Sequence, residues 1–315
     1  MISTLSRLSM PPWPSWGPTA ERTLRAMLGE LEGLPITGGE SSVRLSAAGL
    51  DCGRWLAGFS PVGVSADRLQ GLPERLAMPQ ADAQWFRSLW PSARQIGLAL
   101  EQSRGQVVAK VYLEFALPAP DTRPRPPEQR QVALQIQSCK WRADLPASHR
   151  APSRQTEYWR ISGLDGPSMV RLLREDDNLS EAMRPVYSAM ADALQTAMRA
   201  APHWQDPRLL IVREPGSARR GAGLRLYGSG LQVSAVLAPL KPLCDQWGLA
   251  LDQYPEVLAA WAQQELGWIH AGLDPQGQGF VIVYGALSRA QTRAVLAAAG
   301  SAATGRQASV QEMWK

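Results

Sequence analysis

The chain has 315 residues, of which 45% are hydrophobic and 19% are charged, and its formal net charge is +5. This composition predicts a globular protein, organised as one large domain or two average ones. No apolar run reaches the length of about 18 residues that a membrane-spanning helix needs. The basic excess comes from scattered arginines, whereas nucleic-acid binding calls for clustered basic residues with interleaved aromatic rings. We therefore expect neither a membrane span nor a nucleic-acid partner.

The first residues, MISTLSRLSMPPWPSWGP, lack the charged and apolar segments of a signal peptide. We interpret residues 1–18 as an N-terminal arm ahead of a single domain over residues 19–315. The three cysteines, Cys52, Cys139 and Cys244, are far apart and show no CxxC spacing. This usage argues against a disulfide framework or a zinc site, and it predicts a reducing, cytoplasmic setting.

The N-terminal third alternates between helical and strand patterns. A helix is expected over 19–34, where a threonine cap precedes apolar residues at helical spacing. A weak hairpin follows over 41–59, and a shorter helix is expected over 81–90. The segment 95–115 then predicts a clear hairpin with Gly105 in its turn.

The middle of the chain is less regular. A connector rich in proline and arginine spans 118–131, and a weak hairpin follows over 132–163. A long helix is expected over 178–201, with Pro185 in its first turn or at a kink. The motif REDDNLSE (174–181) resembles the Asp-rich metal motif of all-helical isoprenoid synthases, but it directly precedes this helix. We interpret it as a helix cap, so no metal-ligand set is predicted.

The C-terminal third repeats the alternation more clearly. Hairpins are expected over 208–230 and 266–287, and the second has the turn sequence DPQGQG. Helices over 254–266 and 288–300 flank the last hairpin. The recurring unit is therefore α-β-β-α, and it accounts for about five hairpins and ten strands.

A tyrosine recurs at the same place in three strand segments, AKVYLEF, LRLYGSG and VIVYGAL. These are Tyr112, Tyr227 and Tyr284, and their separations of 115 and 57 residues are close to two periods and one period. One period before Tyr112 lies Trp55, in the strand-like segment GRWLAGF. The remaining unit matches best at 156–163, TEYWRISG, about ten residues out of step. Such a period indicates a repeat architecture.

The hairpin connections predict an antiparallel sheet with two unlike faces. Because side chains alternate along a strand, Lys110, Tyr112 and Glu114 share one face, together with Arg225 and Tyr227 on a later strand. The opposite face is apolar and needs cover, which the helices can supply, while closure of the sheet removes its edges. We therefore predict an α+β fold in which about five α-β-β-α repeats form a closed antiparallel barrel of about ten strands, ringed by helices.

The fivefold α-β-β-α pattern, with Lys-x-Tyr at 110–112 and Arg-x-Tyr at 225–227, resembles the ABBA-type aromatic prenyltransferases. The resemblance extends from about residue 19 over nearly the whole chain. It implies an active site in the barrel lumen, where basic residues bind a prenyl diphosphate and tyrosines surround the allylic cation. The implied acceptor is an indole or phenol of specialised metabolism, and dimethylallyl diphosphate is a representative donor. No cofactor is required in this family, and Mg²⁺ is optional.

The resemblance implies roles for individual residues. Diphosphate binding falls to Arg44, Lys110, Arg160 and Arg225, and the cation shield to Tyr112, Tyr158, Tyr227 and Tyr284. Glu114, on the lumen face, and Glu40, just before the first strand, are candidates for the carboxylate that orients the acceptor and removes the ring proton. Glu114 could instead pair with a neighbouring basic residue. His270 could act as a lumen base or serve a structural role.

The sequence also departs from the family pattern. Gly223 stands where a further arginine is common, and Ile282 replaces a polar residue two positions before Tyr284. Trp55 and Leu56 stand where the first repeat would carry a pair of tyrosines. The departures at Gly223 and Ile282 favour an alternative, a non-catalytic barrel that binds a hydrophobic or anionic small molecule or acts as a partner in an assembly.

Overall fold

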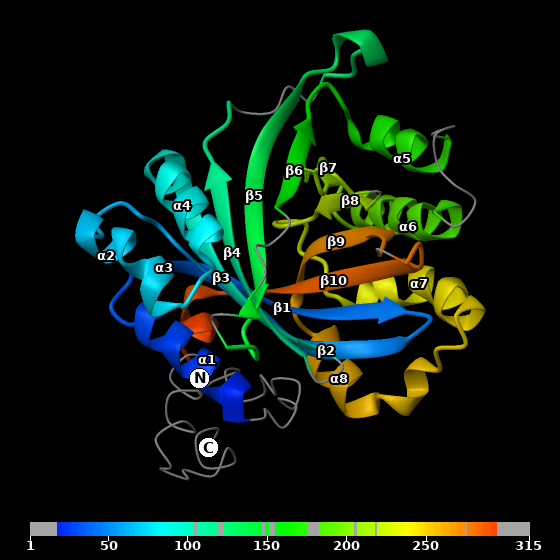
Figure 1. Cartoon of the computed structure of the whole chain (residues 1–315). Coiled ribbons are helices and arrows are strands. Elements are labelled where there is room, and N and C mark those ends of the chain that lie inside the picture. The colour runs from blue at the N-terminus through cyan, green and yellow to red at the C-terminus, as the bar shows by residue number, and fades with distance from the viewer. Residues whose placement is uncertain are drawn as a thin grey trace, which may run out of the picture.

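The computed structural model describes residues 18–103, 106–118, 123–146, 149–150, 155–175, 183–204, 207–217, 219–274 and 276–294. Ten strands form a closed antiparallel barrel in which each strand pairs with its neighbours in the chain and β1 pairs with β10 (Figure 1). The predicted fold class is therefore confirmed. The predicted arm lies outside the described residues, apart from Pro18, where the first helix begins.

The five predicted hairpins are all present. Their strands are β1 (Ile36–Ser46), β2 (Gly49–Phe59), β3 (Ala93–Ser103), β4 (Gln106–Phe115), β5 (Val132–Arg142), β6 (Thr156–Ile161), β7 (Arg208–Arg213), β8 (Arg220–Arg225), β9 (Glu265–Leu273) and β10 (Gly279–Leu287). The last turn depends on Gly277, whose φ of 76° suits glycine. The barrel is closed by pairing across the two ends of the sheet, with Val43 opposite Val283. Closure leaves no sheet edge in the barrel.

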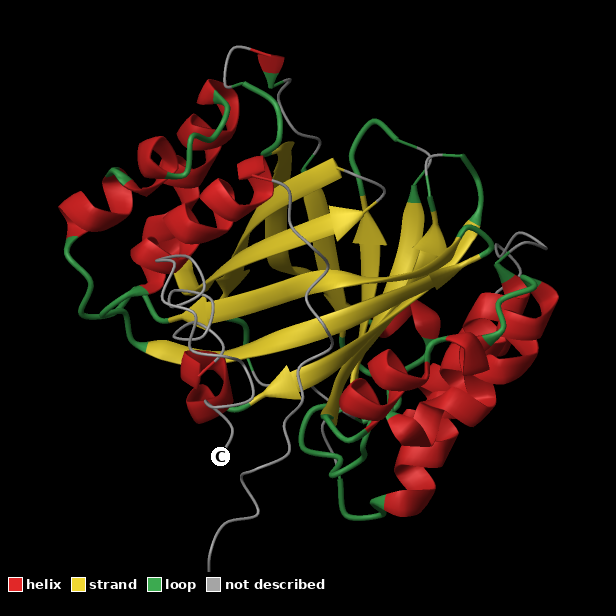
Figure 2. Cartoon of the chain, turned by 90° about the horizontal axis from the view of Figure 1, so that it is seen from below, coloured by secondary structure: helices red, strands yellow, loops and turns green. Residues whose placement is uncertain are grey.

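Helices cover the outside of the barrel in two groups, which lie on opposite sides of it in Figure 2. The first group is α1 (Pro18–Leu31), α2 (Ala66–Gln70), α3 (Leu72–Arg75) and α4 (Gln80–Leu89). The second group is α5 (Gly166–Glu175), α6 (Arg184–Ala200), α7 (Ser234–Gln246) and α8 (Pro255–Ala262). Within the described residues, none of these helices combines the length and apolar character needed to cross a membrane.

The hydrophobic core lies between the strands and the helices, outside the lumen. Val111 and Leu113 on β4 are fully buried and belong to the same apolar cluster as Met27 of α1 and Phe86 of α4. Leu224 on β8 belongs to the corresponding cluster on the other side of the barrel. The side chains of β4 that alternate with these residues face inward, as predicted. The lumen is therefore free to be polar.

The helices differ from the prediction in two respects. α2, α3, α5 and α7 were not expected. α7 is hidden in the sequence by Pro239 and Pro242, which lie inside the helix although proline usually breaks one. Helix α6 begins later than expected, at Arg184, and Pro185 lies in its first turn. Most of the acidic motif 174–181 and the end of the last predicted helix lie outside the described residues.

Candidate active site

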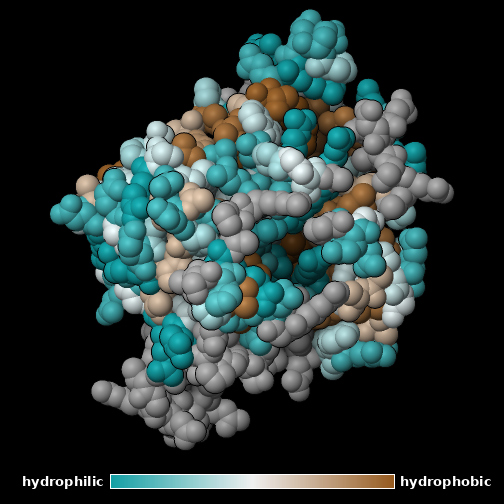
Figure 3. Space-filling model, in the orientation of Figure 1, coloured by the Kyte–Doolittle hydropathy of each residue, from teal (hydrophilic) through white to brown (hydrophobic). Residues whose placement is uncertain are grey.

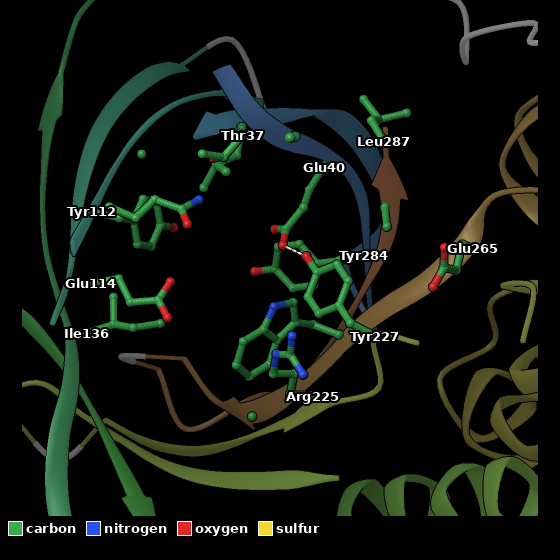
Figure 4. A pocket seen from close by; sticks show the side chains of 18 of the residues that line it. Thr37, Glu40, Tyr112, Glu114, Ile136, Arg225, Tyr227, Glu265, Tyr284 and Leu287 are labelled. Atoms are coloured by element: carbon green, nitrogen blue, oxygen red, sulfur yellow. Dashed lines mark hydrogen bonds between the residues drawn. The ribbon is translucent and has the colours of Figure 1, made fainter. Parts of the chain in front are cut away.

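The barrel lumen contains a cavity of about 700 Å³. Its lining includes seven of the residues predicted from the sequence: Glu40, Tyr112, Glu114, Tyr158, Arg225, Tyr227 and Tyr284. Figure 3 shows a hollow near the centre of the viewed face, surrounded mainly by hydrophilic residues. Figure 4 shows Tyr112, Glu114 and Ile136 on one wall, with Tyr227 and Arg225 on the other side. Such a volume is typical of small-molecule sites.

Glu40 on β1 projects into this cavity, and the hydroxyl of Tyr227 donates a hydrogen bond to its Oε1 (Figure 4). Burial and the nearby charge of Glu114 raise the pKa of Glu40 to about 8, although Arg225 acts in the opposite direction. Glu40 is therefore largely protonated near neutral pH in the ligand-free protein. A carboxyl group whose pKa lies near the working pH is well suited to exchange a proton with a ligand.

Arg225 and Tyr227 form the wall beside Glu40. The Arg225 guanidinium carbon lies 4.9 Å from the centre of the Tyr227 ring, a cation–π arrangement. Tyr227 lies two residues beyond the end of β8 at Arg225. Between them, the backbone N–H of Leu226 continues the pairing by donating to the Gly267 carbonyl at 2.8 Å. A Cβ at Gly267 would lie 2.8 Å from the Tyr227 ring, so the glycine makes room for it.

A layer of aromatic rings crosses the lumen beyond this wall. The ring centroids of Tyr112 and Tyr158 are 6.3 Å apart, and Tyr158 lies 6.3 Å from His270. His270 in turn meets Phe280 edge-to-face at 5.4 Å. Burial raises the pKa of Tyr112, Tyr158 and Tyr284, so their hydroxyls stay protonated. The layer therefore presents neutral aromatic faces and hydroxyls.

On the far side of this layer lies an ion-pair cluster, formed by Arg54 on β2, Glu101 on β3 and Lys110 on β4. Arg54 Nη2 and Lys110 Nζ both donate to Glu101 Oε1, and Arg54 Nε donates to Ser42 Oγ at 3.2 Å. Arg54 is 7% exposed. A small hollow beside Arg54 and Glu101 adjoins the main cavity, and the residues that line both are Glu40, Leu56, Tyr112 and Tyr284.

The ion-pair cluster changes the pKa of each member. Burial acts to raise the pKa of Glu101, but Arg54 and Lys110 outweigh it and lower that pKa to about 2. Burial lowers the pKa of Lys110 to about 7, even though Glu101 opposes this change. Burial acts to lower the pKa of Arg54, but the negative charge of Glu101 outweighs burial and raises that pKa. Glu101 is thus firmly ionised, and Lys110 loses its proton more readily than an exposed lysine.

More basic residues surround this end of the lumen, and they too face carboxylates. Lys140 Nζ lies 3.4 Å from Glu214 Oε1, and Arg219 Nη1 lies 4.0 Å from Glu214 Oε2. Arg44 Nη2 lies 3.6 Å from Asp274 Oδ2. Burial and the positive charges of this region, Arg219 first among them, lower the pKa of His270 well below its usual value. His270 is therefore neutral.

The four predicted diphosphate-binding residues do not converge on one point. Arg225 lines the main cavity, whereas Lys110 belongs to the ion-pair cluster. Arg44 pairs with Asp274 and stacks on Phe280 at 4.6 Å. Arg160 is buried, and its Nη2 donates to the Pro118 carbonyl at 2.7 Å. Their assignment to a diphosphate remains a prediction.

Two residues of the cluster, Arg54 and Glu101, were missed in the sequence. Counting one repeat back from Tyr112 leads to Trp55, but Trp55 faces the outer core, and the lumen positions of β2 are Arg54 and Leu56. Alternation could have revealed Arg54, because it directly precedes the outward core positions Trp55, Ala57 and Phe59 of GRWLAGF. The pairing of Arg54 opposite Glu101 depends on the register of β2 against β3.

Metal-ligating side chains do not gather in the parts of the chain that the structure describes. No group of three or more His, Cys, Asp and Glu side chains is placed there as a metal site would require. The acidic residues of the ion-pair region each face a basic side chain instead. The polar chemistry of the lumen is thus carried by ion pairs, carboxyl groups and tyrosine hydroxyls.

Comparison with solved structures identifies the class of fold. The chain has the αββα-barrel fold, as predicted from its resemblance to the ABBA-type prenyltransferases, and this fold is shared with AnaPT from Neosartorya fischeri. That match has a TM-score of 0.51 at 15% sequence identity, and it covers 80% of this chain and 78% of AnaPT. At this identity the likeness concerns the fold.

Two further solved structures are similar at lower scores. 5-Dimethylallyltryptophan synthase from Streptomyces coelicolor gives a TM-score of 0.45 at 14% identity, covering 78% of this chain and 80% of the synthase. NotF, in complex with brevianamide F and DMSPP, gives 0.44 at 12% identity, with 79% of each chain covered. No protein-family profile and no curated protein sequence matches the chain.

Proposed function

We propose that this protein is an aromatic prenyltransferase, which transfers a prenyl group from a prenyl diphosphate such as dimethylallyl diphosphate to an indole or phenol. One observation carries the proposal: Tyr112, Tyr284 and the Glu40 carboxyl group line both the main cavity and the small hollow beside the buried Arg54. The reaction needs an anion site, aromatic faces for the cation and a carboxyl group close to one another. The αββα-barrel fold supports the same conclusion.

The basic residues would bind the leaving diphosphate. When the C–O bond of the donor breaks, its electron pair stays on the diphosphate oxygen, and negative charge grows there. Fixed cationic donors such as Lys110 and Arg54 stabilise that charge in a site with little water. In the proposed mechanism the cationic side chains supply this stabilisation without a required cofactor, and Mg²⁺ is possible as an additional cation.

The tyrosines would protect the allylic cation from water. Tyr112, Tyr158 and Tyr284 present aromatic faces between the two ends of the lumen. Each such face stabilises a cation by about 0.5–2 kcal/mol. Because burial raises the pKa of these phenols, their hydroxyls stay protonated and are poor nucleophiles toward the cation.

Glu40 would act on the acceptor. The ionised form of Glu40 is the active one, and it forms when Glu40 loses its proton to solvent as pH approaches about 8. An indole N–H or a phenol O–H within the cavity can then donate to this carboxylate, which orients the ring. Attack of the ring on the prenyl cation forms a C–C bond and leaves a cationic ring, whose charge favours the ionised carboxylate. Glu40 then accepts the ring proton, and Glu114 on the opposite wall helps to position the acceptor.

The ion pairs also favour an alternative function. The basic residues near His270 already pair with carboxylates in the ligand-free protein. The lumen should therefore bind an anion more weakly than it would if these basic side chains had no acidic partners. A barrel of this kind could bind an uncharged hydrophobic molecule without catalysis. Cys52, Cys139 and Cys244 all lie within the described residues and none is in a disulfide, which supports a reducing, cytoplasmic setting for either function.

Turnover with defined substrates tests the proposal. The purified protein is incubated with dimethylallyl diphosphate and a panel of indoles and phenols, and products are examined by mass spectrometry. We expect a mass gain of one prenyl unit on at least one acceptor, with release of pyrophosphate. Absence of both with every acceptor would support the non-catalytic alternative.

A lysine variant tests whether the basic end of the lumen binds the donor. Lys110→Ala should weaken binding of dimethylallyl diphosphate at least tenfold, because it removes a buried cationic donor. Lys241→Ala is a matched control, since Lys241 pairs with Asp245 on the surface of α7. If Lys110→Ala and Lys241→Ala bind the donor as well as the wild type, Lys110 has no part in the donor site.

A further inference from the structure

Glu101 holds the two basic residues that lie nearest to the tyrosine layer. Its Oε1 accepts from both Arg54 Nη2 and Lys110 Nζ, so one carboxylate oxygen lies between the two cations. Its side chain is 14% exposed, and the Arg54 side chain is 6% exposed. An anion that binds Arg54 and Lys110 together must therefore take the position of this oxygen.

Glu101 also has a neighbouring basic residue available if it gives up these partners. Lys140 on β5 lies directly across from Lys110 in the strand register, and its charge acts on Glu101. Lys140 itself pairs with Glu214 at 3.4 Å. A shift of Glu101 toward Lys140 would keep the carboxylate partnered while an anion occupies the space between Arg54 and Lys110.

We propose that Glu101 is an internal counter-ion of the anion site, which occupies the place of a diphosphate oxygen until the donor displaces it. This inference rests on the proposed function, because it assigns the ligand that displaces Glu101 to the prenyl diphosphate donor. Glu101 then sets the affinity for the donor without contacting the acceptor.

Displacement of Glu101 also gives the site selectivity among anions. A diphosphate carries several charged oxygens and can contact Arg54 and Lys110 at once, which compensates for the broken pairs with Glu101. Inorganic phosphate is smaller and carries less charge, so it competes poorly with the carboxylate. The wild-type site should therefore discriminate strongly against phosphate, and loss of the Glu101 charge should reduce that discrimination.

Calorimetric titration with inorganic pyrophosphate and with inorganic phosphate tests the inference. Glu101→Gln should bind pyrophosphate at least tenfold more tightly than the wild type, and its preference for pyrophosphate over phosphate should decrease. Glu101→Asp keeps the charge but shortens the side chain, so it should bridge the two cations less well and tighten pyrophosphate binding by a few-fold. The aspartate variant decides the question if Glu101→Gln does not fold, which thermal unfolding would reveal.

The control is Glu74→Gln, which removes the same charge from the surface pair with Arg87 and should leave pyrophosphate affinity within twofold. If the wild type binds pyrophosphate and both Glu101 variants bind it equally or more weakly, the inference is wrong and the proposed function stands. If only the Glu101 variants bind, Glu101 blocks the anion site in the native chain, so the donor does not displace it and both the inference and the proposed function fail. If no protein binds pyrophosphate, both proposals fail.

Discussion

Glu40 and Glu101 are carboxyl groups within one lumen, yet their pKa values differ in direction. Burial raises the pKa of Glu40 to about 8, whereas Arg54 and Lys110 bring that of Glu101 down to about 2 against the effect of burial. Glu40 is bonded to the hydroxyl of Tyr227, and Glu101 lies between two cations. Both carboxyl groups are buried, so burial does not explain the difference between their pKa values. The difference comes from the neighbouring charges, which leave Glu40 protonated and keep Glu101 ionised in ion pairs.

The largest expected effect comes from breaking the ion-pair cluster. Arg54→Met should lower the free energy of unfolding by about 3–5 kcal/mol, because it leaves a buried carboxylate with one cationic partner fewer. Urea denaturation at pH 7 measures this loss. Arg87→Gln breaks a surface pair with Glu74 and should cost less than about 1 kcal/mol. Equal effects of the two variants would mean that the cluster is no more important to stability than a surface ion pair.

The raised pKa of Glu40 is tested by the pH dependence of the free energy of unfolding. The pKa of this carboxyl group is 4.5 in the unfolded reference and about 8 in the folded protein. Between these values the folded state binds more protons, so this group's contribution to stability is complete below about pH 4.5 and is lost as pH rises through 8. Relative to the wild type, Glu40→Gln should gain about 1.4 kcal/mol per pH unit between pH 5 and 8.

Urea titrations of both proteins at several pH values measure this difference. Glu101→Gln is the informative contrast, because Glu101 is ionised in the folded and unfolded states throughout this range. It should therefore not remove the pH-dependent contribution of Glu40. If the stability difference between Glu40→Gln and the wild type does not vary with pH, Glu40 is ionised in the folded protein and the contrast between the two carboxyl groups fails.

The tyrosine layer between the two ends predicts a smaller effect, on turnover. Tyr112→Leu should lower the rate of prenyl transfer by a cation–π contribution of about 0.5–2 kcal/mol, or about 2- to 30-fold. Tyr112→Phe keeps the aromatic face and should retain most of the rate. Single-turnover measurements with dimethylallyl diphosphate compare the two variants. Equal losses would assign the role of Tyr112 to its hydroxyl.

The smallest expected effect concerns the hydrogen bond between Tyr227 and Glu40. Tyr227→Phe should lower the free energy of unfolding by about 1 kcal/mol, because it removes a donor from a carboxyl group in the lumen. A double-mutant cycle with Glu40→Gln isolates the pair from other effects of each substitution. Additive losses would show that the two side chains do not interact in solution.

Much of this fold could be predicted from local patterns. Alternation along β4 separated Lys110, Tyr112 and Glu114 from the apolar face. Turn residues predicted three of the five hairpins, and the other two had weaker signals. The repeated tyrosines located residues that line the same cavity. Helix α7 could not be predicted in this way, because Pro239 and Pro242 oppose a helix locally and the contacts with the barrel outweigh them.

The site was less predictable than the fold. The sequence indicated basic residues for the lumen, but it did not indicate that Lys110 and Arg225 lie in different environments, one in the ion-pair cluster and one in the cavity wall. It also assigned the first repeat to Trp55, whereas Arg54 occupies the lumen. A shift of one residue in a strand exchanges its two faces, so a repeat period alone cannot specify the inward residue.

The sequence by itself determined which side chains alternate along each strand, where the chain turns, and that the sheet needs helices on its apolar face. Only the tertiary structure decided which lumen residues meet. Tyr227 and Glu40 are 187 positions apart, and Arg54 and Glu101 are 47 positions apart. Their contacts depend on barrel closure and on the register between strands, which arise from the packing of the whole sheet and not from any local segment.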